Sequence, residues 1–72
     1  MADERLIDVR GLEPPEPMLK VLHELDSLPA GQVLHMIHHR EPFPLYTALE
    51  ESGFHYRTET GAPGRVDILI WR

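Results

Sequence analysis

The sequence predicts an α+β fold, a two-layer α/β sandwich in which two helices cover one face of a four-stranded mixed sheet, in the order β-α-β-α-β-β. Three observations carry this prediction. Four short segments are apolar or alternate in polarity, two segments between them have apolar residues at helical spacing, and turn residues separate the last two strands. Two helices on one sheet face bury both apolar stripes most simply. The 72 residues are expected to form one domain, residues 1–72.

The first half of the chain contains a predicted strand and a predicted helix. Arg5 to Val9 (RLIDV) is a short apolar run closed by Arg10-Gly11, which is typical of a strand. From Pro15 to about Leu28, apolar residues recur at the spacing of an amphipathic helix. These residues are Met18, Val21, Leu22, Leu25 and Leu28. The sequence Pro29-Ala30-Gly31 is expected to end this helix.

The second half predicts a strand, a helix and a hairpin. Gln32 to His38 (QVLHMIH) is apolar on both alternating faces, as expected for an interior strand. Helical spacing between Leu45 and Ser52 indicates the second helix. Phe54 to Glu59 alternates in polarity, Thr60 to Gly64 has the composition of a turn, and Val66 to Trp71 is the last strand.

The composition excludes several classes of function. The chain has no cysteine, which excludes disulfides, thiolate zinc ligands, thiol nucleophiles and sulfur carried on a side chain. Its formal net charge is −5, so binding to nucleic acid or to an anionic membrane is not expected. No segment resembles a signal or transit peptide or approaches the roughly 20 apolar residues that span a bilayer. We therefore expect a cytoplasmic protein.

The segment GLEPPEPM, residues 11–18, places three prolines and two glutamates at the start of the first predicted helix. Amides in the first turn of a helix lack partners within the helix, so proline is tolerated there, and Pro15 suits the first position. The same free amides and the helix dipole let helix starts bind phosphate, sulfate or a thiolate. Because the prolines remove donors and Glu13 and Glu16 add negative charge, an anion site is not expected at this helix start.

This segment resembles the TusA/SirA-like family of small sulfur-carrier proteins, in which a Gly-Leu-x-Cys-Pro-x-Pro motif places a reactive cysteine at a helix start. Gly11 and Leu12 match the leading pair of that motif, and Pro15 and Pro17 match its two prolines. Pro14 stands where the cysteine is expected. The resemblance therefore implies a TusA-like fold without the residue that carries sulfur.

A second motif makes the chain similar to a cysteine-free branch of that superfamily, domain of unknown function 2249. That branch typically reads GLEPPEPM followed by a Pro-x-Pro-Leu-Tyr element, which Pro42 to Tyr46 (PFPLY) supplies. The likeness extends from about Ile7 to Trp71, and members occur alone or beside hemerythrin-like and other metal- or respiration-related domains. Many members carry a histidine shortly before the Pro-x-Pro, where this chain has Arg40 preceded by His38 and His39.

The histidines near the end of the second predicted strand are the candidate metal ligands. His35, His38, His39 and Glu41 offer imidazoles and a carboxylate, which suit zinc, copper, nickel or iron. On a strand, however, His35 and His38 point to opposite faces, so a three-ligand site requires the chain to turn at His38. Solvated or hydrogen-bonded histidines are the competing interpretation, and no cofactor is expected.

Catalysis is not expected of this chain. Its only serines, Ser27 and Ser52, lie at predicted helix ends, and no nucleophile, base and orienting group occur at recognisable spacing. A binding surface is the alternative. Alternation of the last strand leaves Leu69 and Trp71 on the helix-free sheet face, and an apolar patch with an aromatic residue commonly marks association with another protein or a second copy.

The sequence thus predicts a non-enzymatic binding or accessory module that engages another protein or a second copy of itself. The predicted binding surface consists of two parts, the proline-rich end with Arg10, Glu13, Pro14, Pro15, Pro17, Arg40, Pro42, Pro44 and Tyr46, and the open sheet face with Trp71. One alternative is a metal-binding redox accessory that uses His35, His38 and His39. Another is an accessory of a sulfur relay that binds a carrier protein without carrying sulfur itself.

Overall fold

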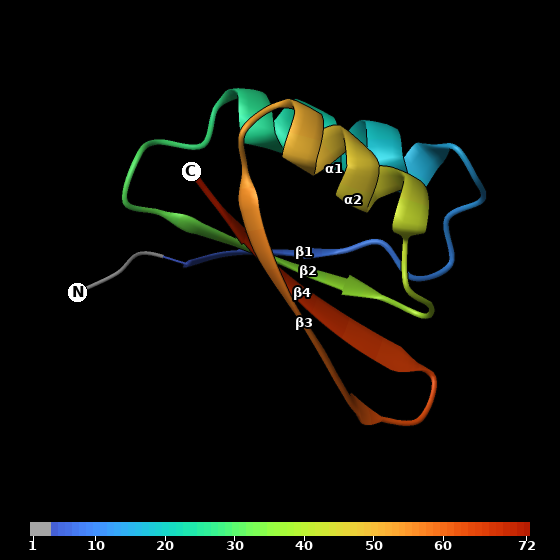
Figure 1. Ribbon diagram of the computed structural model, residues 1–72. Helices are drawn as coiled ribbons and strands as arrows, with labels where there is room; N and C mark the ends of the chain where they lie inside the picture. The colour runs from blue at the N-terminus through green and yellow to red at the C-terminus, as the bar shows by residue number, and fades with distance from the viewer. Residues whose placement is uncertain (1–3) are drawn as a thin grey trace.

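The computed structural model describes residues 4–72; residues 1–3, at the start of the predicted domain, lie outside the described residues. The described elements follow the predicted order (Figure 1). They are β1 (Glu4–Asp8), α1 (Glu16–Asp26), β2 (Val33–His38), α2 (Phe43–Glu51), β3 (His55–Ala62) and β4 (Arg65–Trp71). The predicted α+β sandwich with a four-stranded mixed sheet is confirmed.

The strands form one sheet in the order β1-β2-β4-β3. β1 runs parallel to β2, whereas β2 with β4 and β3 with β4 are antiparallel pairs. Both helices lie on the same side of this sheet, so its other face carries no helix (Figure 1). Within residues 4–72, no helix is long and apolar enough to cross a membrane.

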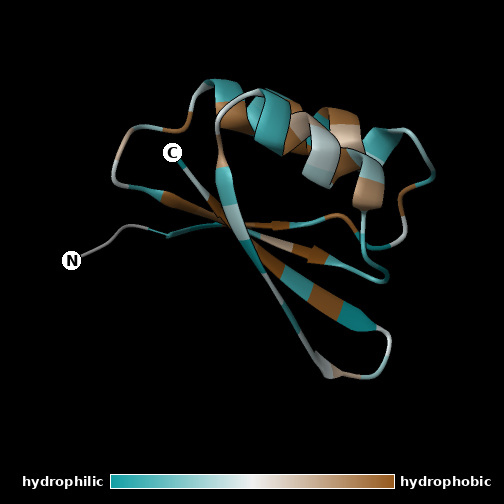
Figure 2. Ribbon diagram, viewed as in Figure 1, coloured by the Kyte–Doolittle hydropathy of each residue, from teal (hydrophilic) through white to brown (hydrophobic). Residues whose placement is uncertain are grey.

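The core lies between the helices and the covered sheet face. Figure 2 shows apolar and polar residues alternating along β4, which matches the alternating burial of that strand. Val21 and Leu25 of α1 are buried against this face, as are Leu45 and Leu49 of α2. The sheet contributes further residues that are fully shielded from solvent: Leu34, Met36, Ile68 and Ile70.

Several element boundaries differ from the predicted ones. α2 begins at Phe43, two residues before the predicted start at Leu45, because Pro44 is tolerated in the first turn, where its missing N–H costs no hydrogen bond. α1 ends at Asp26, although Leu28 beyond it is still buried. The hairpin is also tighter than predicted, because β3 continues to Ala62 through an irregularity in its pairing with β4.

Candidate functional site

A groove lies between the starts of the two helices. β1 and β2 are parallel, so the loops after them leave the same edge of the sheet, and both helices begin at this end of the molecule (Figure 1). The groove has a volume of about 750 Å³. It is lined by Pro14, Pro15, Pro17, Met18, Met36, His38, Arg40, Glu41, Pro42, Phe43, Pro44 and Leu45. Both proline-rich elements of the sequence therefore border one groove.

The walls of this groove are mainly apolar. Met36 and Leu45 are shielded from solvent and belong to the core, so the bottom of the groove is continuous with the protein interior. Met18 is partly buried at the start of α1. Phe43 is 63% exposed, and its ring meets Tyr46 edge-on with centroids 5.7 Å apart. An exposed aromatic ring beside an apolar hollow favours binding of an apolar group.

Backbone donors contribute little to the groove. Both helices carry proline at one of their first two positions, and proline has no N–H group. The amide of Glu16 donates to the Glu13 carbonyl oxygen at 2.9 Å, and that of Leu45 donates to the Pro42 carbonyl oxygen at 2.9 Å. Polar recognition in the groove therefore depends chiefly on side chains.

His38 supplies a hydrogen-bond donor from a largely buried side chain. It is the last residue of β2 and is only 5% exposed. Its Nδ1 accepts the backbone N–H of His39 at 2.8 Å and, more weakly, that of Arg40 at 3.4 Å. Because Nδ1 accepts both bonds, the proton of the neutral ring must sit on Nε2. Burial, and then electrostatic repulsion from His39 and Arg40, hold the pKa of His38 below its ordinary value.

The Nε2–H of His38 faces open space. Within residues 4–72 this atom has no hydrogen-bond partner, yet no side-chain nitrogen or oxygen of that part of the chain is both buried and unpartnered. Nε2 must therefore reach solvent, and the hollow beside His38 is the groove. The groove thus presents one preoriented N–H donor on an otherwise shielded side chain.

Two oppositely charged residues flank this donor. Arg40 is exposed, and in the described part of the chain its guanidinium pairs with no carboxylate, unlike those of Arg5 and Arg65. Glu41 accepts the hydroxyl hydrogen of Tyr46 with Oε1 at 3.3 Å, while its Oε2 has no partner among residues 4–72. A cation, a neutral N–H donor and a carboxylate acceptor therefore lie beside the apolar walls.

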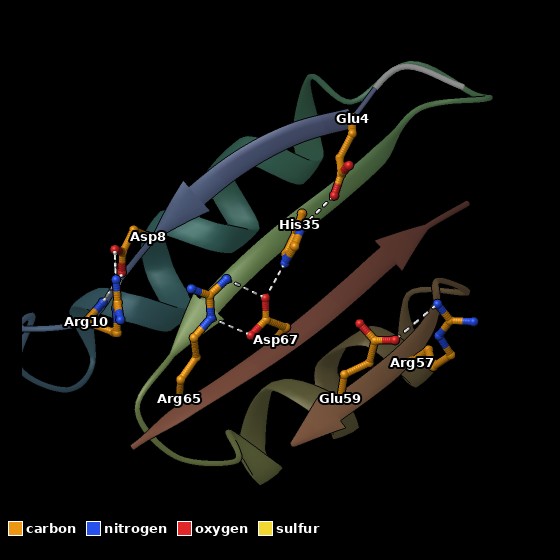
Figure 3. A network of polar contacts seen from close by, with 8 residues as sticks. All are labelled: Glu4, Asp8, Arg10, His35, Arg57, Glu59, Arg65 and Asp67. Atoms are coloured by element: carbon orange, nitrogen blue, oxygen red, sulfur yellow. Dashed lines mark hydrogen bonds and ion pairs between the residues drawn. The ribbon is translucent and has the colours of Figure 1, made fainter. Parts of the chain in front are cut away.

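The other face of the sheet carries a separate polar network (Figure 3). His35 Nδ1 lies 2.5 Å from Glu4 Oε1, and its Nε2 lies 2.6 Å from Asp67 Oδ2. Arg65 Nε donates to the second oxygen of Asp67 at 2.8 Å. Burial alone would lower the pKa of His35, but the bonds to Asp67 and Glu4 outweigh burial and raise it. The bonds from Arg65 and His35 lower the pKa of Asp67.

Comparison with protein families identifies the family of this chain. The family model described as Uncharacterized conserved protein (DUF2249) matches residues 6–72. The chain belongs to this family. The DUF2249 match includes both proline-rich elements that border the groove, from Pro14 to Pro44. No curated protein matches the sequence.

The predicted binding surface of this DUF2249 protein divides into parts. Six of its residues line the groove: Pro14, Pro15, Pro17, Arg40, Pro42 and Pro44. Glu13 is exposed but does not line the groove, and Arg10 pairs with Asp8 at 2.7 Å outside it. Tyr46 is only 8% exposed and stacks on Tyr56 with ring centroids 4.6 Å apart, so it belongs to the core rather than to a surface.

Trp71 lies away from the groove. The pairing of β2 with β4 places Val66 beside His38 and Ile70 beside Leu34, so Trp71 is at the opposite end of the sheet from the proline-rich elements. Its side chain is partly buried on the helix-free face, as the alternation of β4 predicted, and its ring lies 6.0 Å from that of His55. Trp71 and the proline-rich elements therefore lie on separate parts of the molecular surface.

The three predicted metal ligands do not come together. His35 lies on the helix-free face, His38 is buried on the covered face, and His39 follows the end of β2. Residues 4–72 contain no group of three histidine, aspartate or glutamate side chains placed to hold a metal ion. The metal hypothesis required the chain to turn at His38, but β2 remains extended through this residue.

Sequence reasoning missed the apolar half of the site. Met18, Met36, Phe43 and Leu45 line the groove, but their helical or strand spacing identified them only as core positions or not at all. Phe43 carried a usable signal, because a large apolar residue between two prolines at a helix start has little core to reach. Glu41 entered only as a possible metal ligand, whereas the structure places it on the groove.

Proposed function

We propose that this protein is a non-enzymatic binding module that takes up part of a partner protein in the groove between its helix starts. The observation that carries this proposal is the groove itself, about 750 Å³ in volume and bordered by both proline-rich elements. Apolar hollows with a few convergent polar groups are the usual form of a recognition site. Here the polar groups are His38, Arg40 and Glu41.

The chemistry of the lining supports binding rather than catalysis. No serine, threonine, lysine or cysteine lines the groove, so it lacks the usual nucleophiles. His38 is poorly suited to act as a general base, because the lone pair of Nδ1 accepts backbone N–H groups and Nε2 already carries the proton. Its side chain can donate a hydrogen bond to a ligand without exchanging a proton with it.

A partner protein fits the charge of the chain better than other macromolecules. With a net charge of −5, the protein has no excess of cations to replace the counterions of nucleic acid or of an anionic membrane. A cytoplasmic location, predicted from the sequence, is part of this proposal. A second copy is less well supported as the partner, because the helix-free face uses Glu4, His35, Asp67 and Arg65 in pairs within the molecule.

The two alternative functions gain nothing from the geometry. A metal-binding accessory loses its ligand set, since His35 lies apart from His38 and His39. The likeness to TusA-like sulfur carriers stays a prediction, supported by the motif around Gly11 and by the strand and helix order. An accessory role in a sulfur relay requires a carrier protein as the partner, and Pro14 leaves this chain without the sulfur atom.

Matched charge substitutions test the proposed function. Phe43→Glu places a carboxylate on the groove, whereas Leu19→Glu makes the same change at an exposed residue of α1 outside it. Both residues are more than half exposed, so both variants are expected to fold. In affinity capture from a cell extract, we expect a protein retained by the unmodified chain and by Leu19→Glu to be retained about tenfold less by Phe43→Glu. Equal retention by folded Phe43→Glu would contradict the proposed function.

A further inference from the structure

We propose that the groove binds the carboxy-terminal residue of the partner, with an apolar side chain against the groove walls and the terminal carboxylate on Arg40 and the Nε2–H of His38. This inference rests on the proposed function and names the chemistry of the partner at the same site. It follows from three features of the groove: an unpartnered N–H donor on the largely buried His38 side chain, an unpaired cation and walls with few backbone donors.

The unpartnered donor on His38 identifies the polar group of the ligand as an acceptor. His38 is more than nine-tenths buried, and its backbone bonds fix the tautomer with the proton on Nε2. His38 lines the groove, and its Nε2–H has no partner among residues 4–72 and reaches solvent. A ligand that leaves it unpaired loses the hydrogen bond that water otherwise makes, so a bound group must offer an oxygen acceptor at this point.

The charge beside this donor indicates that the acceptor is anionic. Arg40 is the neighbour of His38 on the groove, and its guanidinium forms no ion pair within the described residues. Hydrogen bonds between ionised groups are roughly twice as strong as neutral ones, and a guanidinium matches the two oxygens of a carboxylate. One carboxylate can therefore satisfy both Arg40 and the donor on His38.

The proline walls favour a chain end over a passing chain. A segment that crosses the groove brings peptide groups on both sides of its anchor, and each needs a partner when it leaves water. The helix starts have few amides to offer, since Pro15 and Pro17 border one side and Pro42 and Pro44 the other. A carboxy-terminal residue brings its charge, one apolar side chain and a single amide N–H.

Glu41 distinguishes a chain end from a simple fatty acid. Its Oε2 is unpartnered among residues 4–72 and can accept the amide N–H of the terminal residue. A fatty acid has no donor for this oxygen, so only the peptide compensates the repulsion between its carboxylate and Glu41. The apolar part of either ligand contacts Met18 and Phe43, so the polar groups rather than the walls discriminate between them.

The test uses three small probes with the complete chain. These are acetyl-triglycyl-leucine with a free carboxylate, the same peptide as a carboxamide, and octanoate. Binding is followed by NMR from the backbone resonances of the groove and from the Nε2–H resonance of His38. We expect the peptide acid to shift these resonances and to bind about tenfold more tightly than the carboxamide. Arg40→Gln is expected to abolish this preference, whereas Arg57→Gln, on the exposed β3, retains it.

Each of the other outcomes contradicts a specific part of the inference. Equal binding of the peptide acid and the carboxamide in the groove overturns the carboxylate and leaves the proposed function standing. Tighter binding of octanoate than of the peptide acid overturns the chain end in favour of a free small acid. If neither peptide shifts the groove resonances, the inference fails, while the capture experiment with Phe43→Glu still decides the proposed function. Arg40 is exposed, so folding does not confound its variant.

Discussion

The two faces of β2 carry histidines that do opposite things. His35, on the helix-free face, lies between the carboxylates of Glu4 and Asp67 and is held toward its charged form. His38, three residues later on the covered face, is buried, neutral and bound to backbone amides. Because side chains alternate along a strand, three positions are enough to move the same residue type into a different environment.

This difference shows where unused recognition capacity remains in the molecule. On the helix-free face, both ring nitrogens of His35 contact carboxylates, and Asp67 also accepts a hydrogen bond from Arg65. The polar groups of this network are therefore partnered within the molecule. On the covered face, His38 uses one nitrogen for the fold and leaves the other to the groove. An unpartnered polar atom on a largely buried side chain points to a ligand more directly than a cluster of ionised groups does.

The largest expected difference between the two faces concerns packing. Leu34→Ala removes a fully buried side chain under the helices and is expected to lower the free energy of unfolding by about 2–5 kcal/mol. Leu6→Ala makes the same change on the helix-free face, where Leu6 is 64% exposed, and is expected to cost less than about 0.5 kcal/mol. Urea denaturation of both variants measures the comparison, and similar losses would show that the helix-free face is covered in solution.

Much of the fold could be predicted from the sequence because its signals are local. Helical spacing identified the faces of α1 and α2 that pack on the sheet, and alternation identified the buried side of β4. Boundaries were less accurate where proline is tolerated in the structure, as at Pro44 within α2. The helical spacing of core residues starts only at Leu45 and therefore does not reveal Phe43, which lines the groove.

The sequence predicted where the candidate site lies but not the states of its side chains. Both proline-rich elements could be identified, and the parallel pairing of β1 and β2 brings them together. The states of the two histidines depend on contacts that spacing does not encode. His35 meets Glu4 and Asp67 from 31 and 32 residues away, so its role depends on the register of three strands. The tautomer of His38 depends on how the chain bends after β2, because this bend directs two backbone amides to Nδ1.

A substitution at Asp67 sharpens the comparison electrostatically. Asp67→Asn removes one of the two hydrogen-bonded carboxylates that raise the pKa of His35, and the one with the larger effect. The pKa of His35 is therefore expected to fall, while the pKa of His38 on the other face stays unchanged. Titration of both imidazole resonances by NMR measures the two values separately. Asp26→Asn makes the same substitution at an exposed residue at the end of α1, and as the control it is expected to leave both pKa values in place. A matching shift of His38 would mean that the two faces are coupled through β2.

The smallest expected effect is on the pH dependence of stability, where the two histidines have opposite signs. The raised pKa of His35 stabilises the fold below the ordinary histidine value of 6.5, and this contribution is lost as pH rises through the folded-state pKa. The lowered pKa of His38 means that its contribution is present above 6.5 and is lost as pH falls through its folded-state pKa. Together they place the histidine-dependent maximum near 6.5. In urea denaturation from pH 5 to 9, His35→Gln is expected to remove the decline on the alkaline side and keep the decline on the acid side. Loss of the acid-side decline instead would reverse the roles assigned to the two histidines.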